Sequence, residues 1–222
     1  YRIKRLPPYV FAEVNRLKAD YRSKGVDIID FGMGNPDMDT PHHIVEKLVE
    51  TVRKSRTHRY SSSKGIDGLR KAQARYYKNR FDVALDPERE IIATLGSKEG
   101  LANLAMAITA PGDVMLVPNP SYPIHPYGFM IAGGTLRHLP TLHDGKFKPE
   151  EYMQSLSRAV AHSVPKPVAL VVSFPSNPTA QLCDIDFYKE LISFAKKNNL
   201  WILSDLAYAE IYFDGNPPPS IL

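Results

Sequence analysis

Four short apolar runs in the sequence are each followed directly by side chains of kinds that bind ligands. In chain order these side chains are Gly96-Ser97-Lys98, Tyr122 with His125, Asn177, and Asp205 with Tyr208. A hydroxyl, an ammonium group and the free N–H groups of a first helical turn attract an anion, and a tyrosine ring can stack on a flat molecule. Together these groups would suit a planar, phosphorylated, cationic heteroaromatic ligand.

Asp205 is the most informative of these residues because it ends the apolar run that begins at Trp201. A carboxylate in apolar surroundings is costly to desolvate unless a cation or several hydrogen-bond donors meet it. We therefore expect a partner for Asp205, and the hydroxyl of Tyr208, three residues later, can reach the same place. The alternative is that Asp205 caps a following turn.

Each of the other side chains also has a purely structural interpretation. Ser97 could be a plain helix N-cap with Lys98 in solvent, because the turn lacks the second glycine and the Gly-Lys-Ser/Thr ending of a P-loop. Tyr122 could close the edge of the core, and Asn177 could form an ordinary Asn-Pro turn. His125 could orient a buried carboxylate or face water.

The apolar runs themselves predict the elements that bring these side chains together. They cover residues 90–95, 113–117, 169–174 and 200–204, with helical patterns between them at 97–109, 150–160 and 184–198. Strands that are apolar on both faces and separated by helices are typical of a mostly parallel α/β sheet with helices on both faces. Ligands bind outside the carboxyl ends of such strands.

The first 81 residues read differently, as helices joined by turn-rich segments. We expect helices over 9–24 and 67–81 and a third beginning after Thr40 as N-cap, with Pro41 in its first turn. The 67–81 helix is expected to turn Leu69, Ala72, Tyr76 and Tyr77 inward. Residues 31–37 read as a loop.

Composition and charge exclude several classes of protein. The 222 residues contain one cysteine, Cys183, which rules out an intramolecular disulfide framework and fits a cytoplasmic location. No run approaches the ~18 apolar residues of a membrane span, so no membrane partner is expected. Residues 1–80 carry 18 basic and 9 acidic residues. We interpret the cluster at 53–59 as a solvated helix end, so no nucleic acid is expected, although a nucleic-acid-binding module stays an alternative.

With these residues in place, the chain resembles a class I aminotransferase of fold type I, a family that uses pyridoxal 5′-phosphate. The resemblance extends from Pro7 to about Asp214 and is closest to the glutamate–pyruvate and aspartate aminotransferase branch. The motifs that carry it are Tyr60, Gly65, Leu69-Arg70, Gly96-Ser97-Lys98, Asn119-Pro120-Ser121-Tyr122-Pro123, Asn177-Pro178-Thr179, and Asp205 with Tyr208. The resemblance implies residues 1–35 as an N-terminal arm and small-domain segment, and 36–222 as an incomplete cofactor-binding large domain.

The resemblance also implies roles around the cofactor ring. Asp205 would pair with the protonated pyridine nitrogen, and Tyr208 and Asn177 would bond the ring's phenolic oxygen. Asn177 would also meet the substrate carboxylate. Tyr122 would stack on the ring, and His125 would contact Asp205 without touching the cofactor.

Further roles concern the phosphate and the substrates, an amino acid and a 2-oxo acid. The turn Gly96-Ser97-Lys98 would hold the phosphate. Tyr60 would reach the phosphate of a neighbouring subunit, which implies a homodimer, and Gly34 would belong to a loop over the substrate. No metal is expected.

Two departures from the family pattern affect these expectations. Ala180 stands where many members have glycine. No lysine follows Lys197, and the family's Schiff-base lysine and its substrate-binding arginine lie downstream of the Asp205 position. We therefore expect an N-terminal portion that contains no catalytic residue and is inactive alone. A carbon–sulfur β-lyase on the same scaffold and a non-catalytic binding module are the alternatives.

Overall fold

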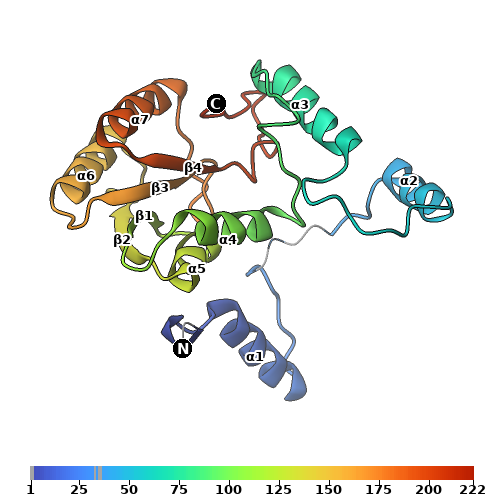
Figure 1. The fold of residues 1–222 in the computed structure, drawn as a ribbon. Helices are drawn as coiled ribbons and strands as arrows, with labels where there is room; N and C mark the ends of the chain where they lie inside the picture. Colours follow the sequence, from blue (N-terminus) through green and yellow to red (C-terminus); the bar gives the residue numbers. More distant parts are fainter. Residues whose placement is uncertain (1–2, 33, 35–36) are drawn as a thin grey trace. The chain divides into compact units, whose positions relative to one another are not determined.

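The computed structural model describes residues 3–32, 34 and 37–222, and Figure 1 shows the course of the chain. The chain forms two compact units. One is Pro7–Ser63, and the other is Lys64–Leu222 together with the first residues of the chain. Met33, Asn35 and Pro36 of the expected loop lie outside the described residues. The functional division near residue 35 stays a prediction.

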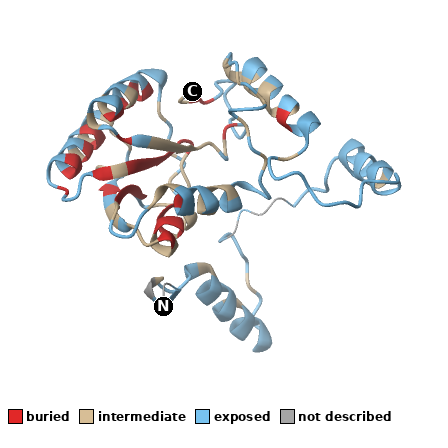
Figure 2. Ribbon diagram, in the orientation of Figure 1, coloured by how far each residue is buried: buried red, intermediate tan, exposed pale blue. Residues whose placement is uncertain are grey.

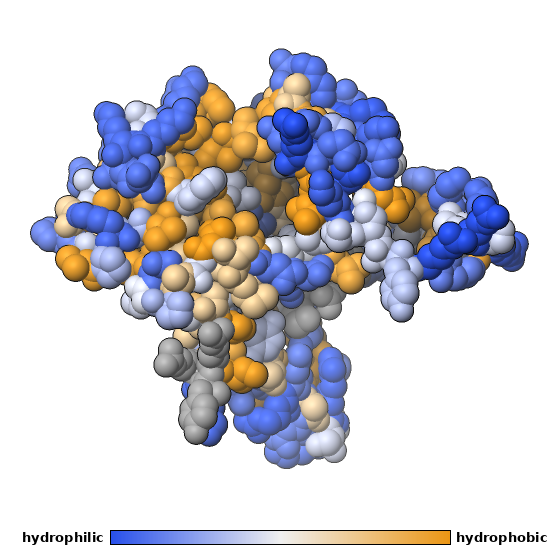
Figure 3. All heavy atoms as spheres, viewed as in Figure 1, coloured by the Kyte–Doolittle hydropathy of each residue, from blue (hydrophilic) through white to orange (hydrophobic). Residues whose placement is uncertain are grey.

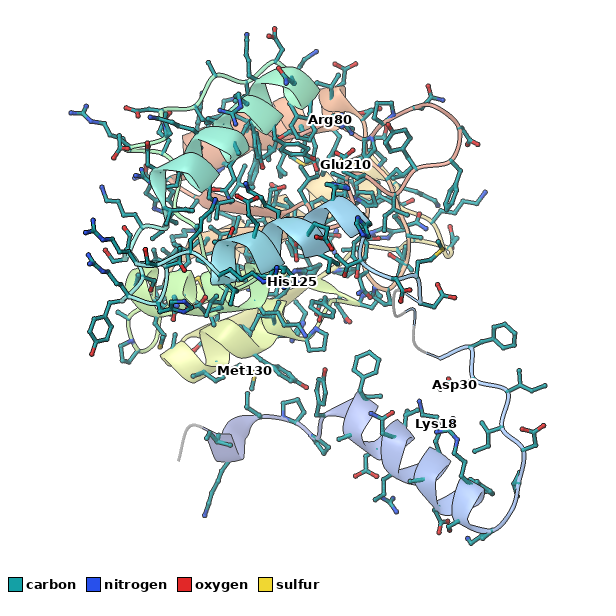
Figure 4. All side chains as sticks on the ribbon, turned by 90° about the vertical axis from the view of Figure 1, so that its right-hand side faces the viewer. Lys18, Asp30, Arg80, His125, Met130 and Glu210 are labelled. Carbon is teal, nitrogen blue, oxygen red and sulfur yellow. The ribbon has the colours of Figure 1, made fainter. Side chains whose placement is uncertain are left out.

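The Pro7–Ser63 unit contains two helices, as expected. They are α1 (Val10–Ser23) and α2 (His42–Val52), and α1 follows the short 3-10 helix η1 (Ile3–Arg5). The predicted start of α2 was one residue early: Pro41 is the N-cap, since its ψ of 134° is extended rather than helical. Neither helix buries a residue (Figure 2). In this unit the ammonium of Lys18 lies 2.8 Å from Asp30 Oδ2 (Figure 4).

The second unit is built on a parallel sheet. The strands are β1 (Val114–Asn119), β2 (Thr135–Pro140), β3 (Pro167–Ser173) and β4 (Trp201–Asp205), in the order β2-β1-β3-β4. Each neighbouring pair is parallel, so the carboxyl ends of all four strands meet at one edge. The predicted fold class is confirmed.

Helices cover both faces of this sheet (Figure 1). Its helices are α4 (Ser97–Ile108), α5 (Ile124–Ala132), α6 (Pro149–Ala161) and α7 (Ile185–Asn198). One face of the sheet, which includes Leu116 and Leu170, packs against α6 and α7. The other face, which includes Met115 and Val171, packs against α4 and α5. Alternate residues of a strand point to opposite faces, so the two central strands, β1 and β3, are buried on both faces.

Three predictions about the elements of this unit were wrong. Residues 90–95 form no strand, because their backbone joins no ladder and Ala93 N–H instead donates to Lys64 O at 2.9 Å. Strand β2 was missed because it lies at the sheet edge and mixes polar with apolar residues, only one of which is buried. Helix α5 was missed because it contains Pro126, which is tolerated in a first helical turn where its N–H would have no partner.

Helix α3 (Asp67–Phe81) has the predicted bounds, but its predicted inward face is only partly confirmed, since Ala72 and Tyr77 are half-buried. Leu69 and Tyr76 are 45% and 41% exposed, whereas Arg70 is 6% exposed. Exposed hydrophobic residues are not confined to α3, and the space-filling view shows others on the surface of the molecule (Figure 3). The guanidinium of Arg70 is buried because it donates to the carbonyl oxygens of Gly65 and Pro87 and, at 3.0 Å, to Glu88 Oε1. Arg70 thereby fastens the turn before α3 to residues 87–88.

Gly65→Ala is expected to destabilise the protein. The φ of Gly65 is +86°, and an added Cβ would lie 2.4 Å from Ala93 Cβ. The left-handed backbone alone costs a non-glycine residue about 1–2 kcal/mol, and the clash adds to it. The matched control is Gly68→Ala in α3, where an added Cβ meets nothing within 4 Å. This control substitution should stabilise the folded protein by about 0.5–1 kcal/mol, because alanine favours a helix more than glycine does. Urea denaturation checks both, and equal midpoints would contradict the prediction.

Candidate functional site

Asp205 ends β4 and faces the buried imidazole of His125. Residue 205 pairs in register with Ser173, the last residue of β3, at the carboxyl edge of the sheet. His125 Nε2 lies 2.8 Å from Asp205 Oδ2, and the two side chains are 1% and 18% exposed. Since an ionised carboxylate can only accept hydrogen bonds, Nε2 of His125 carries the hydrogen of this bond.

The surroundings keep Asp205 ionised. The hydrogen bond from His125 holds the pKa of Asp205 below its ordinary value of 3.8, the charge of His125 and the Ala207 N–H act in the same direction, and burial opposes them. The Ala207 N–H donates to Oδ1 at 3.1 Å. The other imidazole nitrogen, Nδ1, is buried without a hydrogen-bond partner among the described residues. The arrangement presents a fixed anion at the end of an apolar strand.

Asn177 and Tyr208 form the second pair of the site. Asn177 Nδ2 donates to the Tyr208 hydroxyl oxygen at 2.8 Å. Because the oxygen accepts from the amide, the phenolic hydrogen is free to donate to a ligand. Both residues lie in loops just after a strand, Asn177 after β3 and Tyr208 after β4.

The loop that carries Asn177 is braced by Gln181, which the sequence did not single out. Its backbone N–H donates to Ser176 Oγ at 2.8 Å, and its side-chain amide donates to Thr179 O at 3.0 Å. Ala180, the departure from the family pattern, has a φ of +52° in this loop. A glycine takes that backbone without strain, which agrees with the glycine that the resemblance implies at this position.

The glycine–serine–lysine turn leads into α4. Gly96 is the N-cap, with a φ of +86°, and Ser97 is the first helical residue. The ammonium of Lys98 lies 5.3 Å from the centre of the Tyr122 ring, and the Tyr122 ring lies 6.1 Å from the His125 ring. A chain of contacts therefore runs from Lys98 through Tyr122 and His125 to Asp205.

A pocket lies at the carboxyl edge of β1 and β3. Its polar lining is His125, Thr141, Ser173, Ser176, Asn177 and Gln181. His125, the partner of Asp205, and Asn177, the partner of Tyr208, therefore line the same pocket. Asp205 itself is not part of the lining. Thr141 and Ser173 carried no signal in the sequence, because isolated hydroxyl residues have many structural uses.

Tyr60 and Gly34 are the two predicted site residues that do not belong to the unit of the sheet. Both belong to the Pro7–Ser63 unit and are exposed, and their predicted roles stay predictions. Among the described residues, no helix is long and apolar enough to cross a membrane, and no group of three His, Cys, Asp or Glu is placed to hold a metal ion.

Comparison with known proteins identifies the scaffold. Residues 26–221 match the family described as aminotransferase class I and II. The chain belongs to this family. The family uses pyridoxal 5′-phosphate as its cofactor.

Individual class I and II relatives match the whole chain. AatC of Rhizobium meliloti (strain 1021) is 62% identical over 222 residues, and the glutamate-pyruvate aminotransferase AlaC of Escherichia coli (strain K12) is 49% identical over 221 residues. Both matches cover 100% of this chain, but 54% and 52% of those proteins. Aspartate aminotransferase from Thermus thermophilus with maleate matches with a TM-score of 0.86 and 29% identity, over 99% of this chain and 56% of that chain. The chain spans about half the length of these relatives.

The donor set of the structure fits pyridoxal phosphate. Asp205 is an anion suited to a protonated ring nitrogen, and the Tyr208 hydroxyl can donate to a phenolic oxygen. Gly96 opens the N-terminus of a 12-residue helix, where N–H groups and Ser97 suit a phosphate. The ring nitrogen, the phenolic oxygen and the phosphate of the cofactor thus each have a chemically matched group.

The stability of the full-length protein should depend on Asp205 at acidic pH. Since its folded-state pKa is lowered, Asp205 stabilises the fold above its ordinary pKa of 3.8, and this is lost as the pH falls through the folded-state value. Between pH 6 and pH 3, the urea midpoint of the Asp205→Asn variant should therefore fall less than that of the parent protein. The exposed Asp214, changed to asparagine, is the control, and identical pH profiles for both variants and the parent would contradict this.

Proposed function

We propose that the full-length protein carrying this sequence is an amino acid:2-oxo acid aminotransferase that uses pyridoxal phosphate. The observation that carries the proposal is the buried contact of 2.8 Å between His125 and Asp205. This contact keeps an anion at the carboxyl edge of the sheet, next to the pair formed by Asn177 and Tyr208. Family membership supports it, because residues 26–221, which include these four residues, match the family of class I and II aminotransferases.

The residues around the ring act through charge and orientation. When bound, pyridoxal phosphate supplies an electron sink that stabilises negative charge on the α-carbon of the amino acid. Asp205 holds a proton on the pyridine nitrogen, and each pKa unit of that effect corresponds to about 1.4 kcal/mol. His125 holds the carboxylate in place. The Tyr208 hydroxyl donates to the phenolic oxygen, and Tyr122 covers one face of the ring.

The remaining roles concern the phosphate, the substrates and the second subunit. Ser97 and Lys98 hold the phosphate at the N-terminus of α4, and Asn177 also binds the substrate carboxylate. In a homodimer, Tyr60 reaches the phosphate of the neighbouring subunit, and Gly34 lies in the loop over the substrate. A cytoplasmic location is part of the proposal and is supported by the single cysteine.

The Schiff-base lysine is expected downstream of residue 222, which agrees with a chain that spans about half of its relatives. The 222 residues alone are therefore proposed to be inactive. Glutamate and pyruvate are the first substrates to assay, because AlaC is named for that reaction. Product analysis separates transamination from β-elimination: keto acid and ammonia formed without an amino acceptor would identify a lyase instead.

Asp205→Asn tests the central role. An amide cannot hold a proton on the ring nitrogen, so kcat for transamination is expected to fall about 100-fold or more, as the loss of two pKa units would give. Absorbance titration with pyridoxal phosphate should show weaker binding. Asp214→Asn should leave both measurements unchanged. Full activity and undiminished cofactor binding of Asp205→Asn would refute the proposal.

A further inference from the structure

Helix α3 makes a second set of polar contacts, far in sequence from the residues it touches. Arg80, near the end of α3, donates from Nε to Glu210 Oε1 at 3.0 Å. Its Nη2 donates to the carbonyl oxygens of Ala209 and Pro218, each at 3.2 Å. Arg80 and Glu210 are labelled in Figure 4.

Aromatic groups complete this arrangement. The Tyr76 hydroxyl, one turn earlier in α3, donates to the same oxygen of Glu210. The guanidinium of Arg80 lies 4.6 Å from the centre of the Phe81 ring, and its side chain is 17% exposed. The Tyr76 hydroxyl and Arg80 hold the pKa of the Glu210 carboxyl below its ordinary value. Glu210 is therefore an ionised partner of a largely buried arginine.

These contacts bear on the residue next to Ala209, which is Tyr208. Tyr208 lies in an irregular segment after β4, so no ladder fixes its backbone. The segment has two internal backbone bonds, from Ala209 N–H to Leu206 O at 3.2 Å and from Ile211 N–H to Tyr208 O at 3.1 Å. Its ties to the rest of the unit include the amide of Asn177 on the Tyr208 hydroxyl and Arg80 on the neighbouring carbonyl.

We infer that Arg80, together with Tyr76 and Glu210, is a positioning unit for Tyr208. It sets where the phenolic hydroxyl lies relative to the cofactor, without touching the cofactor itself. A guanidinium suits the task because its planar, fixed fork of donors reaches acceptors in different directions, which an ammonium does not reproduce. The inference rests on the proposed function, since the position of the hydroxyl matters only if Tyr208 donates to a bound ring.

The test is a pH titration of the absorbance of pyridoxal phosphate bound to the full-length enzyme. A hydrogen bond to the deprotonated phenolic oxygen lowers the pKa of that oxygen, so losing the donor raises it. Tyr208→Phe should therefore raise the spectral pKa by about one unit or more. Arg80→Met should raise it in the same direction, and Arg80→Lys should give an intermediate value.

A double variant separates positioning from general support. If Arg80 acts through Tyr208, the double variant Arg80→Met with Tyr208→Phe should show the same spectral pKa as Tyr208→Phe alone. Arg75→Met is the matched control, because Arg75 is an exposed arginine of the same helix and should leave the titration unchanged. A normal spectral pKa in Arg80→Met, or fully additive shifts in the double variant, would overturn the inference.

A measurement without cofactor accompanies the titration. Amide hydrogen exchange of residues 206–213 in the apoenzyme should be faster in Arg80→Met than in Arg75→Met. If Arg80→Met does not fold, Glu210→Gln replaces it. Glu210 is 53% exposed, and its variant should shift the spectral pKa less, in the same direction; no shift would overturn the inference. A parent enzyme that shows no band of bound cofactor would instead refute the proposed function.

Discussion

The site depends on one ionised carboxylate held at the end of an apolar strand. A charge in that place is costly unless it is paired and hydrogen-bonded, and His125 and the Ala207 N–H supply the partners of Asp205. The imidazole is itself held in place, because His125 lies in the first turn of α5 and is fully buried. The position of the Asp205 carboxylate is thus set by a buried side chain of the unit rather than by a surface loop.

The sheet and α3 share the work of positioning. The parallel strands bring the loops after β3 and β4 together, so that Asn177 can donate to Tyr208. Helix α3 contributes two arginines that fasten irregular segments: Arg70 holds residues 87–88, and Arg80 holds the segment after β4. Because guanidinium groups satisfy backbone carbonyls that no ladder pairs, they stabilise chain segments without regular structure.

Local sequence was a good guide where one physical signal dominated. Strands β1, β3 and β4 were predicted because their runs are apolar throughout, and helices α4, α6 and α7 from the helical patterns between those runs. Strand β2 failed this test, since an edge strand needs little apolar surface. The run at 90–95 was predicted as a strand but is none. An apolar segment forms a strand only where a neighbouring strand can hydrogen-bond with its backbone. The inward face of α3 was predicted from hydrophobicity, but hydrogen bonds bury Arg70 instead.

The sequence by itself determined the parallel α/β class, the family motifs and the residue types that suit pyridoxal phosphate, because these depend on composition and spacing along the chain. Only the tertiary structure decided which residues meet. The pairing of His125 with Asp205 joins residues 80 apart, and that of Arg80 with Glu210 joins residues 130 apart. Such contacts depend on strand order and helix packing, which place distant segments side by side for reasons that no local pattern of residues contains.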